Sequence, residues 1–131
     1  MVGFQPDGSW IEGIAYWNYT MSYLSKGVGS VISTLGTDYG LMDYPGAQKT
    51  ALWLRSMISP LGGNNFHDSG KITRVSEWLL WLGKIYNNTS YSSMRRSRTV
   101  NGGGGVYDAI WYKSGVPSNE SALPSMAQVD L

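Results

Sequence analysis

Two tyrosines that could do acid–base chemistry stand three residues apart in the segment Tyr16-Trp17-Asn18-Tyr19. Side chains at positions i and i+3 of a helix lie on the same face, so both phenols could reach one cleft. A phenol has an ordinary pKa of about 10, and it can act as a general acid or base when positive charge or hydrogen bonds to the phenolate lower that pKa. The alternative is that Tyr16 and Tyr19 are core aromatic residues with satisfied hydroxyl groups.

The residues before these tyrosines predict a tight turn that leads into a helix. Asp7-Gly8 is a turn dipeptide, and such a junction can hold side chains rigidly at the rim of a cleft. Trp10 and Trp17 have flat apolar faces with a polar tip, which suits stacking on sugar rings. Glu12 falls at the expected helix start, where exposed N–H groups and the helix dipole favour a carboxylate. Its role could therefore be to cap the helix and hold the loop in place, and not to bind a ligand.

Other residue types that could do chemistry are sparse. His67 is the only histidine; it could be a general base, but with so few candidate co-ligands it does not make a zinc site, and we predict no metal. Arg95, Arg96 and Arg98 could pair with an anionic chain or form a solvated face. The glycines at 102–105 are not followed by Gly-Lys-Ser/Thr and so are not a phosphate loop. We expect no cofactor in this chain.

The composition fits a globular chain of about one domain that has few charged residues and many aromatic ones. Of its 131 residues 42% are apolar and 15% are charged, against a usual charged share of about 25%. Six tryptophans and nine tyrosines suit either a sugar-binding cleft or a core that more chain would normally cover. A net charge of +1 argues against nucleic-acid and membrane-surface partners, and no apolar run is long enough to span a membrane. The N-terminus does not resemble a signal peptide.

Apolar periodicity predicts an all-helical fold with no convincing strand alternation. Gly27 and Gly29 are expected to break the first helix, and residues 87–105 are expected to be a polar, glycine-rich connection. Tyr44-Pro45 is a good helix start because proline fits the first helical position. The three main helices are expected at 11–25, 45–59 and 73–86, with weaker segments at 28–35 and 106–112.

Taken in order, several motifs resemble the heparinase II/III-like polysaccharide lyases and the related alginate lyases and dermatan sulfate epimerases. Asp7–Tyr19 resembles their "DG-aromatic-x-EG-x-x-Y-W-x-Y" signature, and Asn65-Phe66-His67-Asp68-Ser69 is similar to an "N-F-x-D-S" loop. Ile110-Trp111-Tyr112 resembles an "l-W-Y" element of the last helix. The segments Leu123-Pro124-Ser125 and Val129-Asp130-Leu131 look like the linker to a β-sandwich.

The resemblance implies a partial (α/α) toroid with about three main helices, short helices and long loops. Residues 1–115 would be the C-terminal part of the toroid, and 116–131 an extended linker toward a β-sandwich domain. Earlier toroid helices and the sandwich would lie outside this sequence, which therefore looks like a fragment. The family also implies a periplasmic or secreted protein.

The implied reaction is β-elimination in an acidic, uronate-containing polysaccharide, which would be the binding partner. By resemblance Tyr19, slightly favoured, or Tyr16 is catalytic, while Trp17, Trp10, Glu12 and Asn18 contact substrate. The family's Asn-His pair and its sandwich-domain histidine or metal site are not found in these residues. Because members of a catalytic unit act non-additively, we expect little or no activity from this chain alone.

Three other interpretations stay open. The chain could be a non-catalytic carbohydrate-binding helical module that uses Trp10, Trp17, Trp53 and Tyr16 as stacking platforms. It could come from a uronate epimerase of the same superfamily, since these residues do not separate lyase from epimerase. It could also be a structural fragment without a function of its own.

Overall fold

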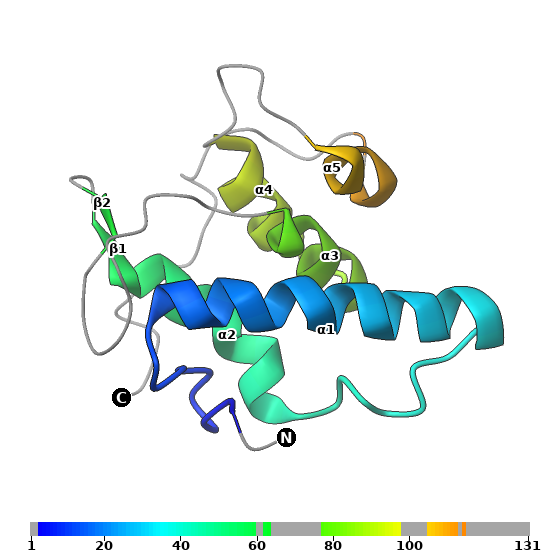
Figure 1. Ribbon diagram of the computed structural model, residues 1–131. Coiled ribbons are helices and arrows are strands. Elements are labelled where there is room, and N and C mark those ends of the chain that lie inside the picture. The colour runs from blue at the N-terminus through cyan, green and yellow to red at the C-terminus, as the bar shows by residue number, and fades with distance from the viewer. Residues whose placement is uncertain (1–2, 60–61, 64–76, 98–104, 113, 115–131) are drawn as a thin grey trace. The chain divides into compact units, whose positions relative to one another are not determined.

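A computed structural model describes residues 3–59, 62–63, 77–97, 105–112 and 114 (Figure 1). The chain divides into two compact units, residues 1–74 and 75–131, and each is described by itself. The described part is mostly helical, which confirms the all-α class. None of its helices is long and apolar enough to cross a membrane.

The described residues of unit 1 form two helices and a short pair of strands. The strands pair antiparallel, with Ile58 opposite Gly63 and Ser59 opposite Gly62. The elements are α1 (Ile14–Leu35), α2 (Pro45–Met57), β1 (Ile58–Ser59) and β2 (Gly62–Gly63). The apolar core is made by Phe4, Ile14, Trp17, Met21, Val28, Met42, Ala47, Ala51 and Leu54.

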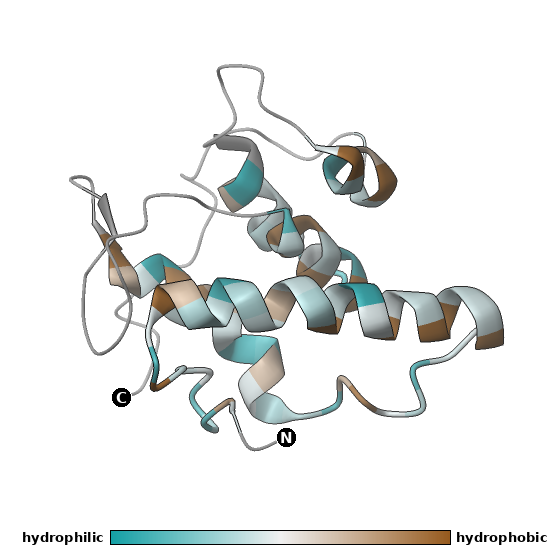
Figure 2. Ribbon diagram, in the orientation of Figure 1, coloured by the Kyte–Doolittle hydropathy of each residue, from teal (hydrophilic) through white to brown (hydrophobic). Residues whose placement is uncertain are grey.

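Helix α1 is ten residues longer at its C-terminal end than predicted, and the expected break at Gly27 and Gly29 is wrong. A glycine inside a helix costs only about 1 kcal/mol, and the apolar period continues past both of them. Figure 2 shows hydrophobic positions recurring along α1 to its end. The helix stops at Gly36, whose φ of 76° places it in the left-handed region and whose N–H donates to the Ile32 carbonyl oxygen at 2.8 Å.

Helix α2 begins at Pro45, which confirms the predicted start, and ends two residues before the predicted limit at 59. The loop before α1 packs against this helix. There the Gly8 N–H donates to the Gln5 carbonyl oxygen at 2.8 Å, and the Ser9 N–H donates to Asp7 Oδ1 at 2.9 Å, which confirms the predicted turn. A side-chain carbon added to Gly46 would lie 2.2 Å from the Gln5 carbonyl oxygen, so loop and helix meet backbone to backbone.

Unit 2 contains α3 (Trp78–Ile85), α4 (Thr89–Ser97) and α5 (Val106–Trp111). The predicted end of the third helix at Asn87-Asn88 is confirmed. Asn87 takes the left-handed conformation (φ 49°), and the N–H of Asn88 donates to the Gly83 carbonyl oxygen at 2.8 Å. Residues 73–76, where this helix was predicted to begin, lie outside the described residues.

Helix α4 corrects the expectation of a polar connection over 87–105. Its first turn is capped by Asn88, whose Oδ1 accepts a hydrogen bond from the Ser90 N–H at 3.0 Å. Tyr91 and Met94 are buried at helical spacing, and this short apolar face packs with α3. Residues 89–97 are mostly polar, and for this reason the sequence pattern did not predict the amphipathic helix that they form.

Helix α5 confirms the predicted short helix near residues 106–112. The rings of Tyr107 and Trp111 stack with centroids 4.9 Å apart, and Trp111 meets Trp78 of α3 edge to face at 5.9 Å. These three aromatic side chains therefore join α5 to α3.

Candidate functional site

Three tyrosines on α1 form an exposed surface, which we call the tyrosine face: Tyr16, Tyr19 and Tyr23. Their spacing of three and four residues places them on one side of the helix. The exposed fractions are 43%, 63% and 62% respectively. The rings of Tyr19 and Tyr23 lie with centroids 5.0 Å apart and planes tilted by 59°. Aromatic rings this exposed are available to a ligand.

An open groove of about 650 Å³ continues from Tyr19 and Tyr23 along α1, and we call it the α1 groove. Gly27 is one of its lining residues, and a side-chain carbon added there would meet nothing within 4 Å. Leu41, from the loop that follows α1, also lines it. None of the described residues that line the groove is charged. The groove therefore offers aromatic and aliphatic surface together with the phenol hydroxyls.

The pKa of Tyr19 is raised above its ordinary value. The cause is chiefly the hydrogen bond with the Tyr23 phenol, followed by repulsion between the two phenolate charges and a small loss of hydration. Even an ordinary phenol, with a pKa of about 10, is protonated at neutral pH, so the shift does not change the protonation state of Tyr19 there. It makes Tyr19 a weaker acid than an ordinary tyrosine, because the phenol holds its proton more tightly.

Trp17, which was predicted to contact substrate, lies in the core of unit 1. Its side chain is fully buried, and its indole N–H donates to Thr50 Oγ1 at 2.6 Å. The Trp17 ring also approaches the Trp53 ring, with centroids 6.4 Å apart. A buried indole cannot stack on a sugar ring while the core is closed, so Trp17 is not part of the site proposed below.

The other predicted contact residues lie apart from the groove lining. Trp10 is half-buried and packs edge to face on Phe4 at 5.1 Å, and among the described residues its indole nitrogen has no hydrogen-bond partner. Glu12 is exposed and precedes Gly13, the N-cap of α1, so the first turn of α1 holds no acidic residue. Asn18 is half-buried on α1. None of the three lines the α1 groove.

The sequence prediction missed Tyr23 and Leu41. Tyr23 carried a signal, because it follows Tyr19 by four residues and extends the same helix face. Leu41 carried none, since only the path of the loop between α1 and α2 brings it to the groove. Tyr16 lies on the tyrosine face but not in the groove lining, so the structure gathers Tyr16 and Tyr19 on one side of α1 and brings only Tyr19 to the groove.

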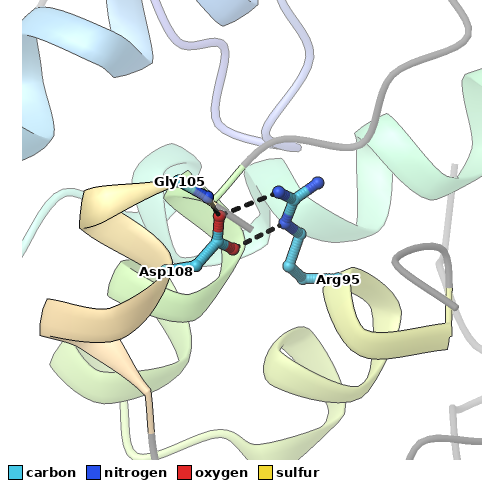
Figure 3. A network of polar contacts seen from close by, with 3 residues as sticks. All are labelled: Arg95, Gly105 and Asp108. Atoms are coloured by element: carbon cyan, nitrogen blue, oxygen red, sulfur yellow. Dashed lines mark hydrogen bonds and ion pairs between the residues drawn. The ribbon is translucent and has the colours of Figure 1, made fainter. Parts of the chain in front are cut away.

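In unit 2 the predicted arginine cluster is partly engaged within the chain (Figure 3). Arg95 Nε donates to Asp108 Oδ1 at 2.8 Å, and Arg95 Nη2 donates to Asp108 Oδ2 at 3.0 Å. Arg95 therefore has an intramolecular partner. The side chain of Arg96 and all of Arg98 lie outside the described residues.

Several predicted features fall where the structure gives no description. They are His67 with the loop 65–69, the glycines at 102–104 and the linker 116–131. Within the described ranges, no three His, Cys, Asp or Glu side chains gather in a way that could hold a metal ion.

Comparison of the chain with models of known protein families, with curated proteins and with solved structures finds no match.

Proposed function

We propose that the tyrosine face and the α1 groove form part of the substrate cleft of a polysaccharide lyase that acts on uronate-containing chains. The proposal takes residues 1–115 as the C-terminal part of a helical toroid and rests on the resemblance of Asp7–Tyr19 to the heparinase II/III-like signature. The observation that carries it is the exposure of Tyr19 and Tyr23 beside an open groove. Tyr and Trp faces are the side-chain surfaces that suit the apolar side of a sugar ring.

The reaction would be β-elimination. A base removes the proton on C5 of the uronate, the electron pair forms a C4–C5 double bond, and the C4–O4 bond breaks. Tyr19, which is protonated at neutral pH, would donate its proton to the departing O4. Tyr16, on the same side of α1, is the alternative donor. The uronate carboxylate must be neutralised to acidify C5, and the resemblance assigns that task to an Asn-His pair that this sequence lacks.

Binding and catalysis can be tested separately on this chain. Binding to heparan sulfate, chondroitin and alginate is measured by calorimetry for the unmodified chain and for Tyr19→Ala and Tyr23→Ala. Tyr112→Ala, a change at an exposed tyrosine of unit 2, is the matched control. We expect binding of one of these polysaccharides, weakened by the first two changes and not by the control. Equal binding by all four proteins would contradict the proposed cleft.

Catalysis is followed by the ultraviolet absorbance of the unsaturated uronate product. We expect little or no product from this chain by itself, because the carboxylate-neutralising groups are not found in it. Steady turnover by this chain would overturn that expectation.

A non-catalytic carbohydrate-binding module is the second candidate, and the uncharged lining of the α1 groove favours it. Phenylalanine keeps the stacking surface and removes the hydroxyl, so the double change Tyr16→Phe, Tyr19→Phe separates the two functions. A binding module would keep its affinity and show no turnover even within a longer protein that carries the toroid. An epimerase would instead exchange the C5 proton with deuterium from solvent without forming the unsaturated product.

A further inference from the structure

We infer that Thr50 is a positioning residue: its hydroxyl fixes the rotation of α1 about its own axis and thereby keeps Tyr19 at the groove. This inference rests on the proposed function, because it gives the tyrosine face a role. Thr50 lies on α2, 33 residues from Trp17 in the sequence, and it is not among the residues that line the α1 groove.

The contact that carries the inference is buried on both sides. Thr50 and Trp17 each have an exposed fraction of 0%. The Trp17 indole N–H can only donate, and it donates to Thr50 Oγ1 at 2.6 Å. A buried N–H group that loses its acceptor is left without a hydrogen bond, and the free-energy penalty of removing it from water is then no longer offset. Any arrangement of α1 that parts these two groups is therefore penalised.

Apolar packing alone would define the rotation of α1 less well. The neighbours of Trp17 on the buried side, Ile14 and Met21, are aliphatic, and burial of such surface has no preferred direction. A hydrogen bond requires its donor to point at its acceptor. The Trp17–Thr50 contact therefore adds a directional restraint to the apolar packing around it.

Rotation of α1 matters because Tyr19 lies on the other side of the helix from this contact. With about 100° per residue, Tyr19 projects roughly 160° away from Trp17 around the helix. A turn of α1 by one residue position would move Tyr19 by about 100° around the helix axis and so shift it within or out of the groove lining. Holding Trp17 against α2 therefore holds Tyr19 in the lining of the α1 groove.

The test compares Thr50→Val, which keeps the shape and removes the hydroxyl, with Thr50→Ser, which keeps the hydroxyl. Native tyrosine nitration, read by peptide mass spectrometry, reports ring exposure at Tyr16, Tyr19 and Tyr23, with the loop residue Tyr39 as internal reference. We expect Thr50→Val to change the nitration of these three tyrosines relative to Tyr39, and Thr50→Ser to leave it unchanged. Unchanged ratios in folded Thr50→Val would overturn the inference.

Hydrogen exchange at the Trp17 indole supplies a second measurement. We expect at least about tenfold faster exchange in Thr50→Val, equivalent to about 1.4 kcal/mol less opening free energy. Exchange as slow as in the unmodified chain would show that Thr50 does not hold the indole. If Thr50→Val does not fold, Thr50→Ala lacks the same hydroxyl, favours the helix more and carries the same test.

The two proposals fail in different ways. If the unmodified chain binds no uronate polysaccharide while Thr50→Val still alters nitration, the proposed function falls and the positioning role stands. In the opposite case the unmodified chain binds polysaccharide, and folded Thr50→Val matches Thr50→Ser in both polysaccharide binding and nitration. The positioning role then falls and the proposed function stands.

Discussion

Arg95 of α4 holds Asp108 of α5 through two hydrogen bonds, at 2.8 and 3.0 Å, and both side chains are largely shielded from solvent. The same carboxylate accepts a third hydrogen bond from the N–H of Gly105, the N-cap of α5, at 2.7 Å. Asp108 thus joins two helices and also caps its own. A single carboxylate performs both tasks because it can accept several hydrogen bonds at once.

This arrangement predicts an acid-sensitive unit 2. Burial alone would raise the pKa of Asp108, but the hydrogen bonds from Arg95 and Gly105 and the charge of Arg95 outweigh it and hold the pKa below its ordinary value of 3.8. The stabilisation is therefore complete above that value and is lost as the pH falls through the lower pKa of the folded state.

We expect Asp108→Asn to lower the free energy of unfolding at pH 7 by about 1–3 kcal/mol and to flatten its decline below about pH 4. Urea unfolding followed by circular dichroism across that range measures both effects. Asp43→Asn, at an exposed position of unit 1, is the control. A decline with the same slope in Asp108→Asn and in the unmodified chain would contradict the assignment.

Two helical glycines give a matched pair of opposite predictions. Gly27→Ala should raise the free energy of unfolding by about 0.5–1 kcal/mol, because the position is open and alanine favours the helix. Gly46→Ala should lower it by about 1–3 kcal/mol, because the new carbon would collide with the Gln5 carbonyl oxygen. Thermal unfolding by circular dichroism compares them. Effects of the same sign would show that the loop does not pack on α2 in this way.

The contact between Tyr19 and Tyr23 predicts a late step in the alkaline titration of the tyrosines. The pKa of Tyr19 is raised by its hydrogen bond with Tyr23, so Tyr23→Phe should return it toward its ordinary value of about 10. Ultraviolet absorbance of the phenolates follows the titration. Tyr39→Phe should leave the late step in place. A late step that persists in Tyr23→Phe would show that the contact between Tyr19 and Tyr23 does not cause it.

Asn88 is half-buried between two helices: its N–H bonds to the end of α3, and its side chain caps α4. Asn88→Ala removes the side-chain acceptor of the Ser90 N–H and should cost about 1 kcal/mol of unfolding free energy. Asn88→Asp keeps an oxygen acceptor and should lose much less. Urea unfolding ranks the two variants, and equal losses would place the effect in the backbone of the turn.

Features set by a few neighbouring residues were predictable. The start of α2 at Pro45, the turn at Asp7-Gly8 and the end of α3 just before Asn87 follow from local backbone preferences and were expected where they occur. The predicted break at Gly27 was wrong because the low helix propensity of glycine is a weak effect, which the packing of a long helix outweighs. Helix α4 was missed because its apolar face holds few residues and its stability depends on α3.

By itself the sequence determined the helical class and the faces of α1, because a period of 3.6 residues places Tyr16, Tyr19 and Tyr23 together and Trp17 elsewhere. It did not determine which face would be buried, since Trp17 and Tyr19 are both amphipathic aromatic residues that suit a core or a cleft. Only the tertiary structure decided this, by bringing Thr50 of α2 to Trp17 and burying both, while Tyr19 stays exposed in the groove that Leu41 also lines. The Trp17–Thr50 hydrogen bond joins residues that are 33 positions apart in the sequence, so it forms only when α1 and α2 pack together. Local sequence patterns do not encode such a contact.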